Sequence, residues 1–167
     1  MSGESAVRPP SIHEEIQQSK PFRSLSQEAY LALLRTADDL KRYVSKVLEP
    51  AGVTMQQYNV LRILRGAGKG GIPTLVVAER MLERTPGVTR LIDRMERKNW
   101  VERSRCTEDR RRVWCKITPT GLALLDRLEK PVQESDAVFD EILSDEELHE
   151  LIGCLDRVRA HLNRSLG

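Results

Sequence analysis

The sequence predicts a mainly α-helical protein that carries one small β-hairpin. Apolar residues recur at helical spacing in several segments, some of which end at glycine or proline. Two short stretches rich in β-forming residues, 100–106 and 112–118, flank a strongly polar tip, which is the pattern of a hairpin. With 167 residues, the chain is long enough to bury a core as one domain or as two small lobes.

The charged residues are distributed unevenly, although the formal net charge is only +2. Residues 80–116 contain 12 lysines and arginines against 6 acidic residues, a local charge of +6. Residues 122–167 contain 5 against 11, a local charge of −6. This asymmetry favours a polyanion-binding lobe joined to a lobe with another role, and a solvated surface with uneven charge is the alternative.

The sequence disfavours several classes of protein. No apolar run approaches the ~18 residues of a membrane span, and residues 1–11 lack a secretory signal, so we expect no membrane partner and a cytoplasmic location. The three histidines are scattered and form no recognisable catalytic group, so we expect neither an enzyme nor a cofactor. The segment 146–151 offers two acids and a histidine to a metal, but a solvated helix face is the favoured interpretation.

The first part of the chain predicts two helices. Residues 30–48 carry an apolar stripe with i, i+3, i+4 spacing, which predicts a long helix that Pro50 ends. Thr54 and Gln57 form a capping box, so a second helix should begin there and end near Gly66.

The middle of the chain predicts two short helices joined by a tight turn, which is a helix-turn-helix. A strand of one or two residues at Ile72 precedes a third helix at about 74–82. Thr85 as a hydroxyl N-cap and Pro86 as the first helical residue predict the start of a fourth helix, and Asn99 predicts its end in a left-handed conformation. The fourth helix should face inward with Val88, Leu91, Ile92 and Met95 and outward with Thr89, Arg90, Asp93, Arg94 and Arg97.

The hairpin, with its tip at 107–111, follows this helix directly, and the combination predicts a winged helix-turn-helix. A long helix is expected from Pro119 with a kink at Pro131. Ser144 and Glu147 form another capping box, which predicts the start of the last helix. Its apolar stripe is Leu148, Leu151, Ile152, Leu155, Val158 and Leu162.

These elements divide the chain into an N-terminal arm, 1–24, a winged lobe, 54–118, and a helical lobe made of 25–53 and 119–167. The apolar stripes of the first and last helices are longer than the winged lobe can cover. Because exposed apolar patches of that size are rare, we expect them to pack against each other or against a second copy of the chain. The helical lobe is therefore predicted to be a dimerisation lobe, and the protein a two-fold symmetric homodimer.

Two segments resemble the MarR family of bacterial transcription regulators. "TPGVTRLIDRMERKNWVER" is similar to the family's recognition helix and the start of its wing, and "DRRRVWCKITPTG" is similar to its wing signature of Asp-x-Arg, a strand and Leu-Thr-x-x-Gly. The likeness covers about residues 25–162 and implies a homodimer that binds duplex DNA sequence-specifically, usually as a repressor. The signature residues here are Asp109, Arg111, Ile117, Thr118 and Gly121.

The resemblance also implies where the DNA contacts lie. At the wing tip, Arg111 is the first candidate and Arg110 the second for insertion into a narrow minor groove, with Asp109 orienting an arginine. Arg90, near the start of the recognition helix, is a candidate for bidentate pairing with guanine. The phosphate contacts are expected from Arg84, Arg94 and Arg97, and the remaining DNA-facing residues are Thr85, Gly87 and Thr89.

Two features of these segments leave choices open. Gly87 stands where the family often has serine, which removes one hydroxyl from the DNA-facing surface. Asp93 is expected to pair either with an arginine of the wing or with Arg97 one helical turn away.

The trigger of regulation is left open by the sequence. Many family members respond to small aromatic or phenolic acids in a cleft between the lobes, and the candidate lining residues, each of which also fits an ordinary core, are Tyr30, Tyr43, Tyr58 and Trp100. Cys106 and Cys115 flank the wing tip and could face each other in a redox switch, although small buried hydrophobes, like reduced Cys154, are the simpler interpretation. A winged helix that binds proteins and no operator is a further alternative. The sequence does not indicate the target genes or the direction of regulation.

Overall fold

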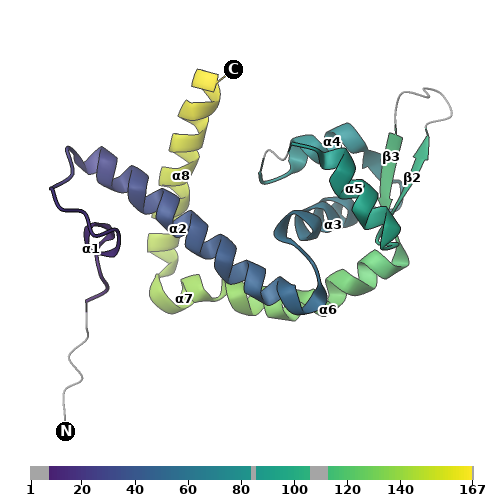
Figure 1. Cartoon of the computed structure of the whole chain (residues 1–167), viewed down its shortest axis with the longest axis horizontal. Helices are drawn as coiled ribbons and strands as arrows, with labels where there is room; N and C mark the ends of the chain where they lie inside the picture. The colour runs from purple at the N-terminus through teal and green to yellow at the C-terminus, as the bar shows by residue number, and fades with distance from the viewer. Residues whose placement is uncertain (1–7, 84–85, 106–112, 167) are drawn as a thin grey trace, which may run out of the picture. The chain divides into compact units, whose positions relative to one another are not determined.

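The computed structural model describes residues 8–83, 86–105 and 113–166, and it confirms a mainly helical fold with one small antiparallel sheet (Figure 1). The chain divides into two compact units, with the division between Ser45 and Lys46. The elements are α1 (Ile12–Glu15), α2 (Leu25–Leu48), a 3₁₀ turn (Glu49–Ala51), α3 (Met55–Ala67), β1 (Ile72–Pro73), α4 (Thr74–Arg80), α5 (Val88–Arg97), β2 (Val101–Arg105), β3 (Val113–Ile117), α6 (Pro119–Asp136), α7 (Val138–Ile142) and α8 (Asp145–Leu166).

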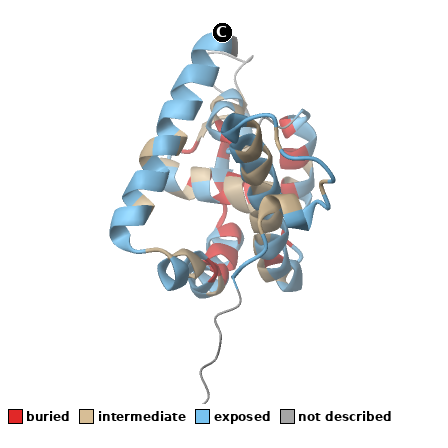
Figure 2. Ribbon diagram, turned by 90° about the vertical axis from the view of Figure 1, so that its left-hand side faces the viewer, coloured by how far each residue is buried: buried red, intermediate tan, exposed pale blue. Residues whose placement is uncertain are grey.

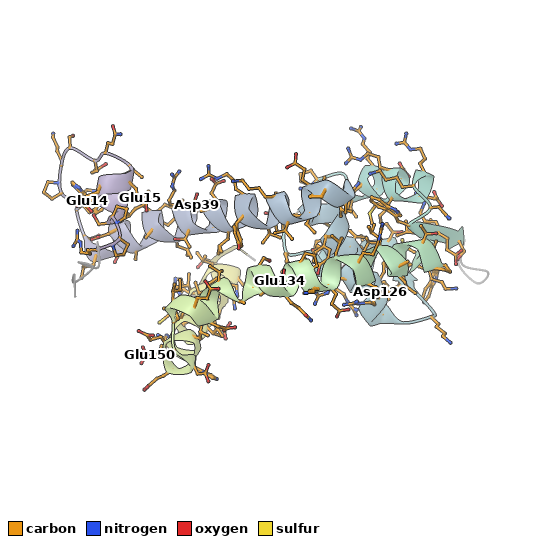
Figure 3. The ribbon with its side chains drawn as sticks, turned by 90° about the horizontal axis from the view of Figure 1, so that it is seen from below. Glu14, Glu15, Asp39, Asp126, Glu134 and Glu150 are labelled. Atoms are coloured by element: carbon orange, nitrogen blue, oxygen red, sulfur yellow. The ribbon has the colours of Figure 1, made fainter. Side chains whose placement is uncertain are left out.

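The first unit consists of α1 and most of α2. A capping box at Ser11 and Glu14 starts α1, and the Ser11 amide donates to the Glu14 carboxylate at 2.6 Å. The next residue, Glu15, forms an ion pair with Arg35 of α2 at 3.6 Å, and both acids of α1 are labelled in Figure 3. Along α2 only Leu48 is buried. The large apolar residues that α2 leaves exposed are Leu25, Tyr30, Leu33, Leu34 and Tyr43.

The second unit holds the hydrophobic core and the sheet. The strand order is β1–β3–β2 with antiparallel pairing throughout, and Cys115 of β3 lies opposite Ile72 on one side and Arg103 on the other. Helices α3, α5 and α6 supply most of the core, which Figure 2 shows in red. Its fully buried side chains include Val60, Leu61, Leu64, Val77, Leu91, Ile92, Met95, Val101, Cys115 and Leu125.

Helix α8 contains no buried residue among those described and is exposed or intermediate along its length (Figure 2). Part of its predicted apolar stripe is exposed, with 55% of Ile152 and 50% of Leu162 open to solvent. None of the helices in the described part of the chain is long and apolar enough to cross a membrane. Acidic side chains also project from α2, α6 and α8, as Figure 3 labels for Asp39, Asp126, Glu134 and Glu150.

Most predicted element boundaries are confirmed. The capping boxes at Thr54 and Ser144 form as expected, with the Thr54 amide donating to Gln57 Oε1 at 3.0 Å and the Ser144 amide to Glu147 Oε2 at 2.8 Å. Helix α6 continues past Pro131 to Asp136. The short helix α7 was not predicted, because its five residues carry no helical period that a sequence pattern can show.

Two helix boundaries differ from the prediction. Helix α4 ends at Arg80 and not at Leu82, because Met81 is extended and the Leu82 amide donates to the Asn59 side chain at 2.9 Å. Helix α5 begins at Val88 and not at Pro86, because its N-cap is Gly87 at φ 85°. A left-handed residue cannot be the second residue of a right-handed helix, so Pro86 lies in the preceding turn.

A tight junction joins the end of α5, the base of the wing and the start of α6. Asn99 at φ 56° ends α5, as predicted, in a Schellman motif: the Asn99 amide donates to Glu96 O at 2.8 Å and the Trp100 amide to Met95 O at 3.0 Å. The Thr118 hydroxyl donates to Asn99 O at 2.6 Å and accepts from the Gly121 amide at 3.1 Å. The signature threonine is therefore both the N-cap of α6 and a link to α5.

Gly121 allows the close approach at this junction. A Cβ at this position would overlap the Trp100 carbonyl oxygen and lie 2.8 Å from Ile117 Cγ1. Since one of these neighbours is backbone, α6 would have to move away from the wing. The signature glycine is thus required by packing.

We predict that Gly121→Ala lowers the free energy of unfolding by about 1–3 kcal/mol, because it overpacks the junction. Gly66→Ala is the matched control: it lies in α3, where an added methyl group would meet no atom within 4 Å, and it should stabilise by about 0.5–1 kcal/mol. Urea titrations at one fixed protein concentration measure both effects. Equal stability of the Gly121→Ala variant and the wild type would contradict the packing argument.

Candidate nucleic-acid interface

Helix α5 has the two faces that the sequence predicted. Its inner face is buried and packs into the core of the second unit. Its outer face exposes Thr89, Arg90, Arg94 and Arg97, whereas Asp93 is half-buried. The arginines are the side chains that a nucleic acid would meet first, and the described part of the chain contains no ion pair to Arg90 or Arg94.

The start of α5 also suits an anion. Gly87 provides no side-chain cap, so the N-cap residue itself offers no side-chain acceptor to the first-turn amides of α5. Such amides, at the positive end of a helix dipole, are a common phosphate site. Gly87 therefore has a role through its left-handed backbone as the N-cap of α5, which its replacement of the family's usual serine did not reveal. Arg84 and Thr85 lie outside the described residues, as do Asp109, Arg110 and Arg111 of the wing tip.

One arginine of the wing holds the two acids of α5. The guanidinium of Arg103, in β2, donates to Glu96 Oε2 at 2.6 and 3.1 Å, and its Nη1 lies 2.8 Å from Asp93 Oδ1. The Arg103 amide also donates to Glu96 Oε1 at 3.2 Å. Asp93 thus pairs with a wing arginine, which was one of the two expected partners. Arg97 instead donates to the Asp93 backbone oxygen at 3.4 Å.

This group of Arg103, Asp93 and Glu96, the Arg103 clamp, is partly shielded from water. The Arg103 side chain is 26% exposed. Its hydrogen bonds hold the pKa of Glu96 below the usual range and, reciprocally, raise the pKa of Arg103. Partial burial opposes both shifts, and the charge attraction adds to them. The ion pair between Glu96 and Arg103 therefore stays charged at neutral pH.

The clamp changes the charge that α5 presents. Without Arg103, the two acids of α5 would offset two of its three arginines. Because Arg103 takes both carboxylates, the positive charge of Arg90, Arg94 and Arg97 remains available to a polyanion. The sequence did not single out Arg103 as a site residue. A signal was present, because β-strand alternation places Arg103 on the same face as buried Val101, and the preceding helix carries two acids three residues apart.

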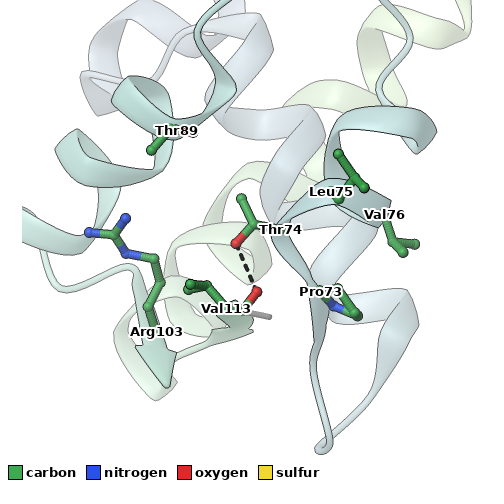
Figure 4. Close-up of a pocket in the computed structure, with 7 residues that line it drawn as sticks. All are labelled: Pro73, Thr74, Leu75, Val76, Thr89, Arg103 and Val113. Carbon is green, nitrogen blue, oxygen red and sulfur yellow. Dashed lines mark hydrogen bonds between the residues drawn. The ribbon is translucent and has the colours of Figure 1, made fainter. Parts of the chain in front are cut away.

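A pocket of about 490 Å³ lies beside the clamp, between β1, α4, the start of α5 and the wing (Figure 4). Its lining combines apolar groups from Pro73, Leu75 and Val76 with the polar side chains of Thr74, Thr89 and Arg103. The Thr74 hydroxyl donates to Val113 O at 3.1 Å, which ties α4 to β3 at the floor of the pocket. Thr89, an exposed residue of α5, and Arg103, the central cation of the clamp, therefore share one small-molecule-sized cavity.

The four aromatic candidates for a ligand cleft lie on different elements. Tyr30 and Tyr43 are exposed on α2, whereas Tyr58 of α3 and Trp100 are half-buried. Tyr58 contacts the Arg62 guanidinium, and Trp100 lies under the Lys98 ammonium at 4.2 Å. Their role in ligand binding stays a prediction.

Neither a facing cysteine pair nor a metal-binding group is found among the described residues. The residue opposite Cys115 in the hairpin is Arg103, so Cys115 does not face Cys106 across the strands as a redox switch would need. Cys106 itself lies outside the described residues. Cys115 is fully buried, and burial raises the pKa of its thiol to about 11, which leaves little thiolate for oxidation. Cys154 is an exposed free thiol. Among the residues that the structure describes, no group of acids, histidines and cysteines could hold a metal.

The helix-turn-helix of α4 and α5 and the adjoining wing define a winged helix-turn-helix regulator of transcription. A profile of the MarR family matches residues 53–113. The regulator PecS of Dickeya dadantii is 30% identical over 125 residues, which cover 74% of this chain and 75% of PecS. The chain belongs to the MarR family.

Solved structures of MarR-family proteins are similar to this chain in fold. A MarR transcription factor from Planctomyces limnophilus is 41% identical, with a TM-score of 0.63 over 81% of this chain and 98% of that one. The S. aureus MepR–DNA complex is 25% identical, with a TM-score of 0.72 over 79% of this chain and 97% of that one. The predicted class, a transcription regulator and not an enzyme, is therefore confirmed.

We predict that Arg103→Met lowers the free energy of unfolding by about 1 kcal/mol at neutral pH, because it removes the partly exposed ion pairs with Glu96 and Asp93. The folded pKa of Glu96 lies below the ordinary value of 4.5, so this stabilisation is complete above that value and is lost as the pH falls through the folded pKa. The stability curves of wild type and variant should therefore converge in acid.

Arg94→Met is the control for this experiment, because it also replaces an arginine by methionine, but on α5, where Arg94 has no carboxylate partner among the described residues. Its stability should follow that of the wild type at a constant offset. Urea titrations between neutral and acidic pH measure all three proteins. A gap between wild type and Arg103→Met that does not change with pH would mean that Arg103 stabilises by packing alone.

Proposed function

We propose that this regulator binds duplex DNA sequence-specifically through α5 and the wing, as a homodimeric repressor that a small aromatic acid releases. The observation that carries this function is the outer face of α5, where three arginines stay available because Arg103 takes both acids. The similarity to MepR, whose structure was solved with DNA, supports the same mode of binding. A regulator of this kind works where the chromosome is, so we place it in the cytoplasm.

Each proposed DNA contact follows from its position. Arg90 is on the first turn of α5, which such motifs insert into the major groove, so we assign it to base edges. Arg94 and Arg97 are further along the helix and are assigned to phosphates, together with Arg84. Gly87 and Thr89 lie at the start of α5, and Thr85 precedes it. At the wing tip, Arg111 and Arg110 are assigned to the minor groove, with Asp109 orienting them.

The dimer is proposed to form through the helical lobe, 25–53 and 119–167. Both long helices support this, because α2 exposes apolar side chains such as Leu34 and α8 exposes others such as Ile152. Exposed apolar stripes on long helices are typical of an interface. A two-fold dimer would present one α5 from each copy to a pseudo-palindromic operator.

Release by a small acid would act at the Arg103 clamp. A carboxylate in the 490 Å³ pocket would compete with Asp93 and Glu96 for Arg103, and its apolar body would contact Leu75 and Val76. Freed acids on α5 would then repel phosphate, and the ligand would crowd Thr89. A protein-interaction module without operator binding is the competing function, and it predicts no discrimination between operator and scrambled DNA.

We predict that the chain sediments at micromolar concentration with twice its 19.0 kDa mass, because a monomer would expose both apolar stripes. Ile152→Asp puts a charge into the α8 stripe and should shift the protein toward the monomer. Glu150→Lys also changes the charge of α8, but at a polar position, and serves as the control. A wild type that stays monomeric would remove the dimer from the proposal.

We predict that Arg90→Ala costs about 1–3 kcal/mol on the operator and much less on scrambled duplex, because base contacts carry sequence information. Arg111→Ala should weaken binding to both, and should reduce the slope of log affinity against log salt by about one per lost contact, hence about two per dimer. Titrations at several salt concentrations measure both variants, with Lys130→Ala, at an exposed position of α6, as a control.

The outcomes separate the two assignments. Equal losses on operator and scrambled duplex for Arg90→Ala would make Arg90 a phosphate contact. Unchanged affinities and slopes for Arg111→Ala would leave the wing tip as a solvated charged turn.

A further inference from the structure

A second pocket, of about 330 Å³, lies at the base of the wing, where the end of α3 and the strands β2 and β3 meet the start of α6. It shares no lining residue with the pocket beside the Arg103 clamp. Its volume is at the lower end of the range of about 300–1,000 Å³ that small-molecule sites occupy. Nothing in the proposed DNA contacts uses it.

The pocket has an apolar surface on one side. Ile117 of β3 contributes to its lining, as do Pro119 and Leu122 of α6. Leu122 is 37% exposed, although Leu125 in the next turn of α6 is buried. A bound apolar group would remove this surface from water, which is favourable. The body of a fitting ligand is therefore apolar.

The other side of the pocket is positively charged. Arg65, Lys69 and Lys116 line it together with a single acid, Glu102. Glu102 is already engaged by Lys116, its cross-strand neighbour, at 3.3 Å. Lys69 has no ion-pair or hydrogen-bond partner among the described residues. The cations of the pocket thus exceed its acids, and at least one of them is available.

Arg65 is held only weakly by its acidic neighbours. Its Nη1 lies 4.0 Å from Asp126 and 3.9 Å from Glu129, both on α6, where Figure 3 labels Asp126. The Asp126 side chain is 70% exposed, so this pair is loose and solvent-screened. The C-terminal end of α3 and the N-terminal end of α6 both reach the pocket, and their opposite partial charges offset each other. The positive potential therefore comes from the side chains.

We infer that this pocket binds a small organic anion, with one carboxylate on an apolar body. The carboxylate pairs with Arg65 and Lys69, since guanidinium and ammonium groups are its preferred partners. The apolar body lies on Ile117, Pro119 and Leu122. This site is additional to the proposed function and does not depend on DNA binding or on the Arg103 pocket.

The test is an amide NMR titration of the full-length, ¹⁵N-labelled protein without DNA. Two probes, benzoate and hexanoate, each carry one carboxylate, on an aromatic and an aliphatic body respectively. Two further probes are controls: benzyl alcohol lacks the negative charge, and inorganic phosphate lacks the apolar body. Saturable shifts of the Gly68, Lys69 and Ile117 amides are expected with one or both carboxylates. Benzyl alcohol and phosphate should bind at least tenfold more weakly.

The double variant Arg65→Gln, Lys69→Gln should weaken carboxylate binding at least tenfold, with its remaining amide spectrum unchanged as evidence of folding. Lys130→Gln removes an exposed cation of α6 that lies outside the pocket, and it should leave binding unchanged. Carboxylate shifts confined to Thr89 and Arg103 would overturn the inference and locate binding in the other pocket. Equal binding of benzyl alcohol, or no effect of the double variant, would also overturn it.

Discussion

The contact between the first turn of α6 and the Trp100 carbonyl fixes the geometry of the winged lobe. Gly121 permits this contact because it has no Cβ, and Thr118 secures it through hydrogen bonds to Asn99 and Gly121. Trp100 precedes β2 and Thr118 follows β3, so the same junction sets where both strands of the wing leave the body of the lobe. The recognition helix, the wing and α6 are thereby held as one rigid arrangement, and every contact proposed with DNA depends on it.

The Arg103 clamp adds a second link between the wing and α5, and this link carries charge. The junction positions the two elements by packing and backbone hydrogen bonds, which respond little to solution conditions. The clamp depends on two carboxylates and one guanidinium, so protonation of Glu96 would weaken it, as would the competing anion proposed above. The same three residues decide how much positive charge α5 offers to DNA. Arg103 therefore links the wing to α5, compensates the acids of α5 and is the residue at which the proposed ligand would act.

The two pockets of the winged lobe have different relations to this arrangement. The pocket of Figure 4 includes Thr89 and Arg103, so an occupant would touch both the DNA-facing helix and the clamp. The pocket at the base of the wing is lined by the end of α3, the strands and the start of α6, and neither of those two residues lines it. An occupant there would brace the wing strands against α6. It would be attracted by Lys69, a cation without a partner among the described residues, and would not have to displace a carboxylate from the clamp.

The sequence by itself determined most of the elements, the class of fold and the family, because these rest on local signals. Helical periodicity, capping boxes at Thr54 and Ser144 and the wing signature act within a few residues of the chain. It did not determine that Gly87 is the N-cap of α5, since the left-handed backbone there overrides the usual preference for Thr85 and Pro86. Only the tertiary structure decided the partners of Asp93 and Glu96, the packing role of Gly121 and the two pockets. Each of these depends on residues of different elements, whose distances are set by the course of the chain from α5 into β2, the pairing of β2 with β3 and the approach of α6.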